Sequence, residues 1–130
     1  MDKVHEELCL HRLQQAEQCL VSAKVLIDIK DYNGASNRVY YAVFHAMRSV
    51  LALESVDFSK HSGVIAYFRK TYIKTGVFPV AASITIGKAF DLRSDGDYDD
   101  DIEVTEEQVK SLLEDVKVFV TQVKEYVGVN

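Results

Sequence analysis

Apolar residues recur at the three- and four-residue spacing of an α-helix in almost every part of this 130-residue chain. The last segment is the clearest case, because Val109, Leu112, Val116, Val120 and Val123 fall on one side of a helix. One proline and six glycines leave few points at which a helix must end. No segment has the alternating pattern of a β-strand. The sequence therefore predicts an all-α bundle in a single domain, residues 1–130.

Five helical segments account for most of the chain. They are expected over about residues 3–29, 33–53, 60–74 and 80–93, and from Thr105 onward. Asn33 and Ser59 are candidate N-caps, and Thr105 with Gln108 has the spacing of a capping box. Gly76 is expected to end the third segment. An acidic loop, residues 94–104, is expected to join the last two segments.

Charge is distributed unevenly along the chain. The net charge is −5, yet residues 33–90 sum to +5 and residues 91–130 to −8. The overall sign argues against broad binding to duplex DNA, whereas the central positive region permits a local phosphate site. The N-terminus is too polar for a signal peptide, and no apolar run approaches the ~20 residues that cross a bilayer. We therefore expect a cytoplasmic protein that does not bind membranes.

Arg38 and His45 stand seven residues apart within the second segment. At ~100° per residue they share one face of the helix, with Tyr41 at its edge. Three small residues lie on the same face: Ala42, Ser49 and Ala52. Small residues allow another helix to approach closely, either from the same chain or from a second copy. We expect a homodimer interface at these three positions, with Arg38 and His45 lining it.

Three motifs occur in a fixed order: NRVYYAVFHAM (37–47), KHSG (60–63) and DLRSDGDY (91–98). With them the chain resembles, over nearly its whole length, the small stand-alone HEPN proteins of bacteria and archaea. The resemblance implies an up-and-down four-helix bundle with an additional short helix, assembled as a symmetric dimer.

The resemblance also implies three functions. Many HEPN proteins are metal-independent ribonucleases whose motif is an arginine followed four to six residues later by a histidine; others bind nucleotides or partner a minimal nucleotidyltransferase in toxin–antitoxin pairs. Arg38 and His45 fit the loose form of that motif. In the ribonucleases the motif lies on a late helix, whereas here the late Arg93 is followed by SDGDY without a histidine. We therefore expect a nucleotide- or RNA-phosphate-binding module of a toxin–antitoxin or nucleotidyltransferase-associated system. The alternatives are an endoribonuclease toxin and a purely structural helical dimer.

Each candidate residue has a chemical role in that reading. Arg38 can bind phosphate oxygens bidentately, and His45 can exchange a proton with the 2′-OH or the leaving oxygen. Tyr41 can stack a base, and Lys60 and His61 can contact phosphate at a helix N-terminus. Three further site residues follow from the resemblance: Arg93, Asp97 and Tyr98. In the alternative, structural reading, Arg38 pairs with an acid such as Asp97, and His45 is a hydrogen-bonded interface residue.

The acidic loop also invites a metal interpretation. From Asp95 to Glu106, acids occupy positions 1, 3, 5, 7, 9 and 12 of an EF-hand-like loop. Position 6 is Asp100 where that loop requires glycine, and one copy is present. No histidine pair has metal-binding spacing on a helix. We therefore expect a solvated acidic loop, with neither a metal nor a cofactor.

Overall fold

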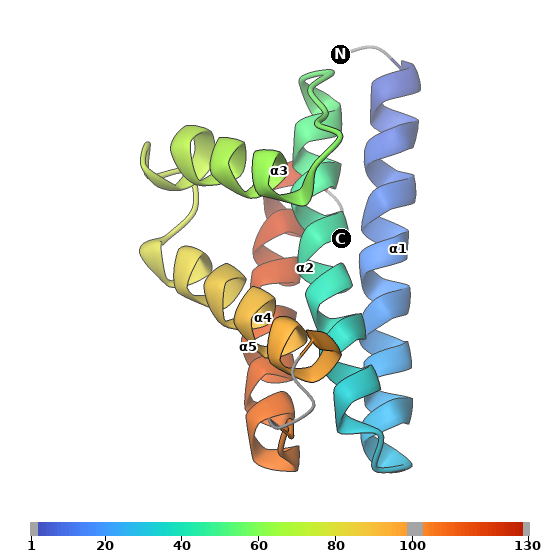
Figure 1. Ribbon diagram of the computed structural model, residues 1–130. Helices are drawn as coiled ribbons and strands as arrows, with labels where there is room; N and C mark the ends of the chain where they lie inside the picture. Colours follow the sequence, from blue (N-terminus) through green and yellow to red (C-terminus); the bar gives the residue numbers. More distant parts are fainter. Residues whose placement is uncertain (1–2, 99–102, 129–130) are drawn as a thin grey trace.

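The computed structural model describes residues 3–98 and 103–128 and shows an α-helical bundle (Figure 1). Its elements are α1 (Lys3–Asp28), α2 (Tyr32–Leu53), α3 (His61–Phe68), the π-helical turn η1 (Arg69–Ile73), α4 (Val80–Tyr98) and α5 (Glu106–Val127). The described residues contain no strand. The predicted all-α class, four long helices with a short one inserted, is confirmed.

Helix α2 is the centre of the bundle, and it packs against α1, α3, α4 and α5. Its large apolar side chains are fully buried: Val39, Tyr40, Val43, Met47, Val50 and Leu51. Burying one such side chain stabilises the fold by roughly 1.5–3 kcal/mol. Figure 1 shows α1 and α2 side by side, while α3 and α4 diverge from one another on the side of α2 away from α1. A side chain at the edge of α2 can therefore meet residues from several helices.

The small-residue face of α2 is covered by α1 of the same chain. Ala42 and Ser49 are 0% exposed, and Ala52 is 2% exposed. Two contacts fix the antiparallel register, because Arg12 of α1 donates to the Arg48 carbonyl at 3.1 Å and Arg38 lies 3.9 Å from Cys19 Sγ. The assignment of these three residues to a dimer interface is therefore wrong. Spacing showed that a helix approaches here, but not which chain supplies it.

Most helix ends follow local chemistry. The capping box at Thr105 and Gln108 is present, with both reciprocal hydrogen bonds formed. The N-cap of α2 is Asp31, whose carboxylate accepts from the Gly34 N–H at 2.9 Å, and not Asn33. Gly76 adopts a φ of 85° after η1, a left-handed conformation that favours glycine.

Two predicted boundaries move. The N-cap of α3 is Lys60 rather than Ser59, and its side chain makes no cap hydrogen bond. Helix α4 continues to Tyr98, so the first part of the predicted acidic loop is helical. The side chain of Asn33 accepts from the Val104 N–H at 3.3 Å, which ties the segment before α5 to the start of α2. Residues 99–102 of that loop, and the side chains of residues 97 and 98, lie outside the described residues.

The α1–α2 seam predicts the effect of enlarging Ala42. Ala42→Leu forces extra methylenes between two packed helices, so we expect the free energy of unfolding to fall by about 1–3 kcal/mol in urea denaturation. Ala81→Leu is the matched control on α4, because Ala81 is exposed, and we expect a change within about 0.5 kcal/mol. Equal stability of the two variants would show that α1 does not pack closely against α2 at Ala42.

Candidate functional site

Four polar or aromatic residues line one edge of α2: Arg38, Tyr41, His45 and Arg48. Their spacing of three, four and three residues places them along a single stripe. Each side chain is partly exposed, whereas all the residues between them along the chain are buried. The stripe is therefore the part of α2 where ionisable side chains are accessible to solvent.

Two arginines converge on the ring of Tyr41. The guanidinium carbon of Arg38 lies 5.1 Å from the ring centroid, and that of Arg93, from α4, lies 5.5 Å from it. Arg93 also lies 4.9 Å from the ring of the buried Tyr40. All three distances suit cation–π attraction. The fold thus brings a residue from α4 onto the stripe of α2.

Arg38 is held by neutral groups. Its Nε and Nη2 donate to the side-chain oxygen of Asn37 at 3.1 and 2.8 Å. Among the described residues, no carboxylate lies within ion-pair distance of Arg38. The alternative in which Arg38 pairs with Asp97 concerns a side chain outside the described residues. The geometry leaves the charge of Arg38 uncompensated within the described part of the chain.

His61 joins the site from the first turn of α3. Its ring packs on Phe44 with centroids 4.1 Å apart, and its Nδ1 lies 3.0 Å from the hydroxyl of Tyr40. The ring centroid of Tyr41 is 5.7 Å away. Burial lowers the pKa of His61 below its ordinary value, and the positive charges of Arg93 and Arg48 lower it further. His61 therefore favours the neutral form at neutral pH.

His45 is also close to Tyr41, with ring centroids 6.1 Å apart. Its Nδ1 is buried and has no hydrogen-bond partner among the described residues. Burial lowers the pKa of His45, as do the positive charges of Arg48, Arg38, Arg12 and, last, His11. Because the folded pKa lies below the unfolded one, His45 stabilises the fold fully above about pH 6.5 and loses this contribution as the pH falls.

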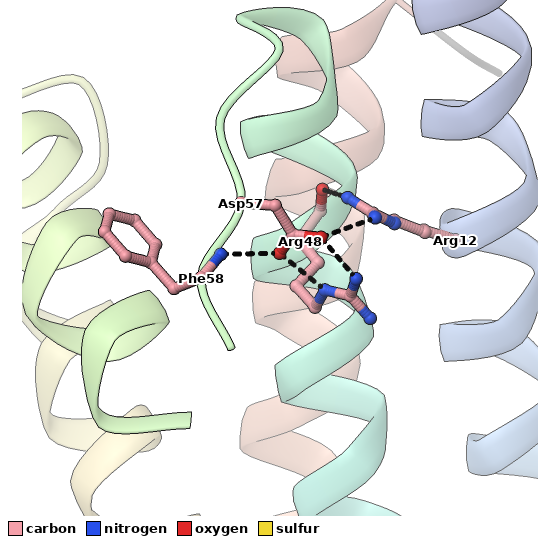
Figure 2. Close-up of polar contacts among 4 residues, drawn as sticks. All are labelled: Arg12, Arg48, Asp57 and Phe58. Carbon is pink, nitrogen blue, oxygen red and sulfur yellow. Dashed lines mark hydrogen bonds and ion pairs between the residues drawn. The ribbon is translucent and has the colours of Figure 1, made fainter. Parts of the chain in front are cut away.

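An ionic staple, formed by Arg12, Arg48 and Asp57, fixes the connection between α2 and α3 (Figure 2). One oxygen of Asp57 lies 3.1 Å from Arg12 Nη2 and 2.7 Å from Arg48 Nη2. The other oxygen accepts from Arg48 Nε at 3.3 Å and from the Phe58 N–H at 2.8 Å. The hydrogen bond from Arg48 is the main cause that lowers the pKa of Asp57, so the staple is charged at neutral pH.

The residues of the staple are not among the site residues that the sequence predicts. One sequence signal points to Arg12, because helical spacing places it on the same side of α1 as the apolar Cys9 and Ala16. In the structure, the side chain of Arg12 is buried, with 7% of the residue exposed. A buried arginine requires a negative or carbonyl partner. Nothing in the sequence identifies that partner as Asp57, which is 45 residues away.

The structure brings together some predicted site residues and separates others. It groups Arg38, Tyr41, His45, His61 and Arg93 around the rings described above. Lys60 is exposed at the N-cap of α3. Asp97 and Tyr98 end α4, and their side chains lie outside the described residues. In the described part of the chain, no group of three or more acidic, histidine or cysteine side chains could hold a metal ion.

The fold defines an all-α class in which a short helix is inserted between the second and third long helices of a bundle. Residues 10–126 match the HEPN domain, and the chain belongs to that family. It is 31% identical to a UPF0332 protein of Thermotoga maritima, over 94% of this chain and 92% of that protein. No helix in the described ranges combines the length and the apolar character that spanning a bilayer requires.

Two further relatives come from Methanocaldococcus jannaschii. The protein named "Putative toxin MJ0142" is 32% identical over 88% of this chain and 78% of its own length. The protein named "Putative toxin MJ0605" is 33% identical over 86% of this chain and 83% of its own length. The similarity to all three relatives therefore spans most of the HEPN domain.

Removing the carboxylate of Asp57 tests the staple. Asp57→Ala leaves the buried Arg12 without its negative partner, and we expect the free energy of unfolding to fall by about 1–3 kcal/mol. The control is Glu114→Ala, which breaks the exposed ion pair with Lys117 and should change stability by less than about 0.5 kcal/mol. Both values come from urea denaturation at neutral pH, and an Asp57→Ala variant as stable as the control would contradict the staple.

Proposed function

We propose that this HEPN protein binds the phosphate of RNA or of a nucleotide at the cluster of Arg38, Tyr41, His61 and Arg93. One observation carries the proposal: the guanidinium groups of Arg38 and Arg93, from two helices, converge on one partly exposed aromatic ring. Two positive charges beside one partly exposed ring favour the binding of an anion there. Guanidinium groups match the planar, bidentate geometry of phosphate oxygens.

The rings extend the proposal from phosphate to nucleotide. Tyr41 presents an aromatic surface beside both arginines, and Phe90 of α4 is 41% exposed and lies 6.1 Å from Tyr40. Bases of single-stranded RNA stack on such rings, with an energy of roughly 1–3 kcal/mol per base. A phosphate at the arginines with a base on an adjacent ring is the arrangement that this surface fits best.

The proposed setting is a toxin–antitoxin system. The names of the two Methanocaldococcus jannaschii relatives support it, and a minimal nucleotidyltransferase is the protein partner that the family resemblance implies. A homodimer is also part of the proposal. Its interface lies elsewhere than at Ala42, Ser49 and Ala52, because α1 covers them.

A metal-independent ribonuclease is the second candidate function. It is favoured by His45, whose lowered pKa leaves it neutral beside the positive charge of Arg38. A neutral imidazole can accept the proton of the RNA 2′-OH while an arginine binds the phosphate oxygens. The RNA supplies its own nucleophile in this reaction.

Binding of RNA tests the first candidate. We expect Arg38→Ala and Arg93→Ala each to weaken binding of a fluorescent single-stranded 2′-O-methyl RNA by roughly 10- to 100-fold, the equivalent of one charge-assisted hydrogen bond. Lys110→Ala on α5 is the control, since Lys110 is exposed and pairs with Glu106; its affinity should stay within about twofold of wild type. Equal losses in all three variants would indicate only non-specific attraction of charge.

Cleavage of RNA tests the second candidate. Wild-type protein incubated with cellular RNA and EDTA should release fragments with 2′,3′-cyclic phosphate ends. His45→Gln should abolish cleavage yet bind 2′-O-methyl RNA with wild-type affinity, because the phosphate is held by the arginines. Intact RNA after incubation with the wild-type protein would leave the binding module as the function.

A further inference from the structure

The two histidines of the site, His61 and His45, differ in the hydrogen-bond partner of their Nδ1 atom. Nδ1 of His61 lies 3.0 Å from the hydroxyl of Tyr40, whose side chain is fully buried. Nδ1 of His45 is buried and has no hydrogen-bond partner within the described part of the chain. Both rings flank Phe44, with centroids 4.1 Å away for His61 and 6.0 Å away for His45. The two imidazoles therefore lie near the same aromatic ring but differ in their hydrogen bonding.

The hydroxyl partner allows His61 to change its charge without losing a hydrogen bond. When the imidazole is neutral, Tyr40 can donate its proton to Nδ1. When the imidazole is protonated, the Nδ1–H can donate to the oxygen of Tyr40. The bond also fixes the ring, so that Nε2, on the other side of the ring, is the nitrogen left for a ligand.

His45 lacks this freedom. A protonated imidazole carries a hydrogen on both nitrogens, so charging His45 would leave a buried N–H donor at Nδ1 without an acceptor. The neighbouring cations oppose that charge as well, since Arg48 and Arg38 on the same helix and Arg12 on α1 all act to lower its pKa. The protein therefore opposes uptake of a proton by His45 from solvent, and in the ribonuclease alternative His45 would carry a proton only transiently, during cleavage.

Charged groups face His61 from two helices, Arg93 from α4 and Arg48 from α2, and both act to lower its pKa. On its own segment the adjacent Lys60 is also positive. A bound phosphate would act in the opposite direction, because a negative charge beside the ring favours the imidazolium. Binding of an anion and uptake of a proton by His61 would then strengthen each other.

We infer that His61 is the proton-carrying phosphate ligand of this site and that His45 remains neutral while the ligand binds. The inference rests on the proposed phosphate-binding function and adds the residue that makes binding depend on pH. In the bound state the Nε2–H of His61 donates to a phosphate oxygen, and its second proton, at Nδ1, comes from solvent. No bond to the ligand is made or broken.

The experiment measures the affinity of a fluorescent single-stranded 2′-O-methyl RNA, which lacks the 2′-OH needed for cleavage, from about pH 5 to pH 8 at constant ionic strength. Wild-type affinity should rise as the pH falls, by up to about tenfold per pH unit for one proton taken up. His61→Gln should lose this slope and His45→Gln should keep it. Tyr40→Phe should move the slope to lower pH, because the imidazolium loses its acceptor.

A slope that persists in His61→Gln and disappears in His45→Gln would overturn the inference and leave phosphate binding intact. Absence of wild-type binding at every pH would instead refute the proposed function. An NMR titration of the histidine Cε1–H signals in the ligand-free protein gives a second, independent readout. We expect His61 to titrate at higher pH than His45, and the reverse order would also overturn the inference.

Discussion

The close packing of α1 against α2 determines which side chains of α2 can reach the surface. Alanine and serine on the facing side of α2 let α1 approach, and the large apolar side chains of α2 pack against α4 and α5. Between these two buried faces only a narrow edge of the helix remains. Arg38, Tyr41, His45 and Arg48 occupy that edge. The site is thus a consequence of how the central helix is covered.

Electrostatics then divides the positive charges at this edge into two groups. Arg12 and Arg48 are neutralised by Asp57, which also anchors the connection leading to α3 and so helps to place His61. The second group is Arg38 and Arg93, whose guanidinium groups both lie near the ring of Tyr41. The first group stabilises the fold, and the second is the pair of arginines on which the proposed phosphate site depends.

The sequence predicts the parts of this structure that depend on local chemistry. Helical spacing identified the helices. The Thr105–Gln108 capping box could be predicted because its two residues are only three positions apart. Arg38 and His45 could be placed on one face by geometry alone. Arg93 entered the predicted site only through the family resemblance, since no local pattern links α4 to α2. The match to the HEPN domain confirms that resemblance.

The sequence-based predictions are wrong where several residues or helices suit a position equally well by local chemistry and a tertiary contact selects one of them. Asp31 and Asn33 are both suitable N-cap residues, and the path of the chain selects Asp31. The face around Ala42 was correctly read as a helix-packing surface but was assigned to a second copy, because spacing does not identify the helix that approaches. The contact of Arg12 with Asp57 joins residues far apart in sequence and is set by the finished bundle. Long-range pairing of this kind cannot be inferred from a single chain without the fold.

The central claim is that Arg38 and Arg93 together hold a phosphate. The most direct test is to record the ¹⁵Nε–¹H signals of the arginine side chains while single-stranded 2′-O-methyl RNA is added. Arg69, in η1, is the internal reference, because it donates to the hydroxyl and the carbonyl of Ser83 in α4. Our account predicts that the Arg38 and Arg93 signals shift together and saturate at one RNA concentration, while the Arg69 signal stays in place. Shifts at Arg69 without shifts at Arg38 and Arg93 would contradict it.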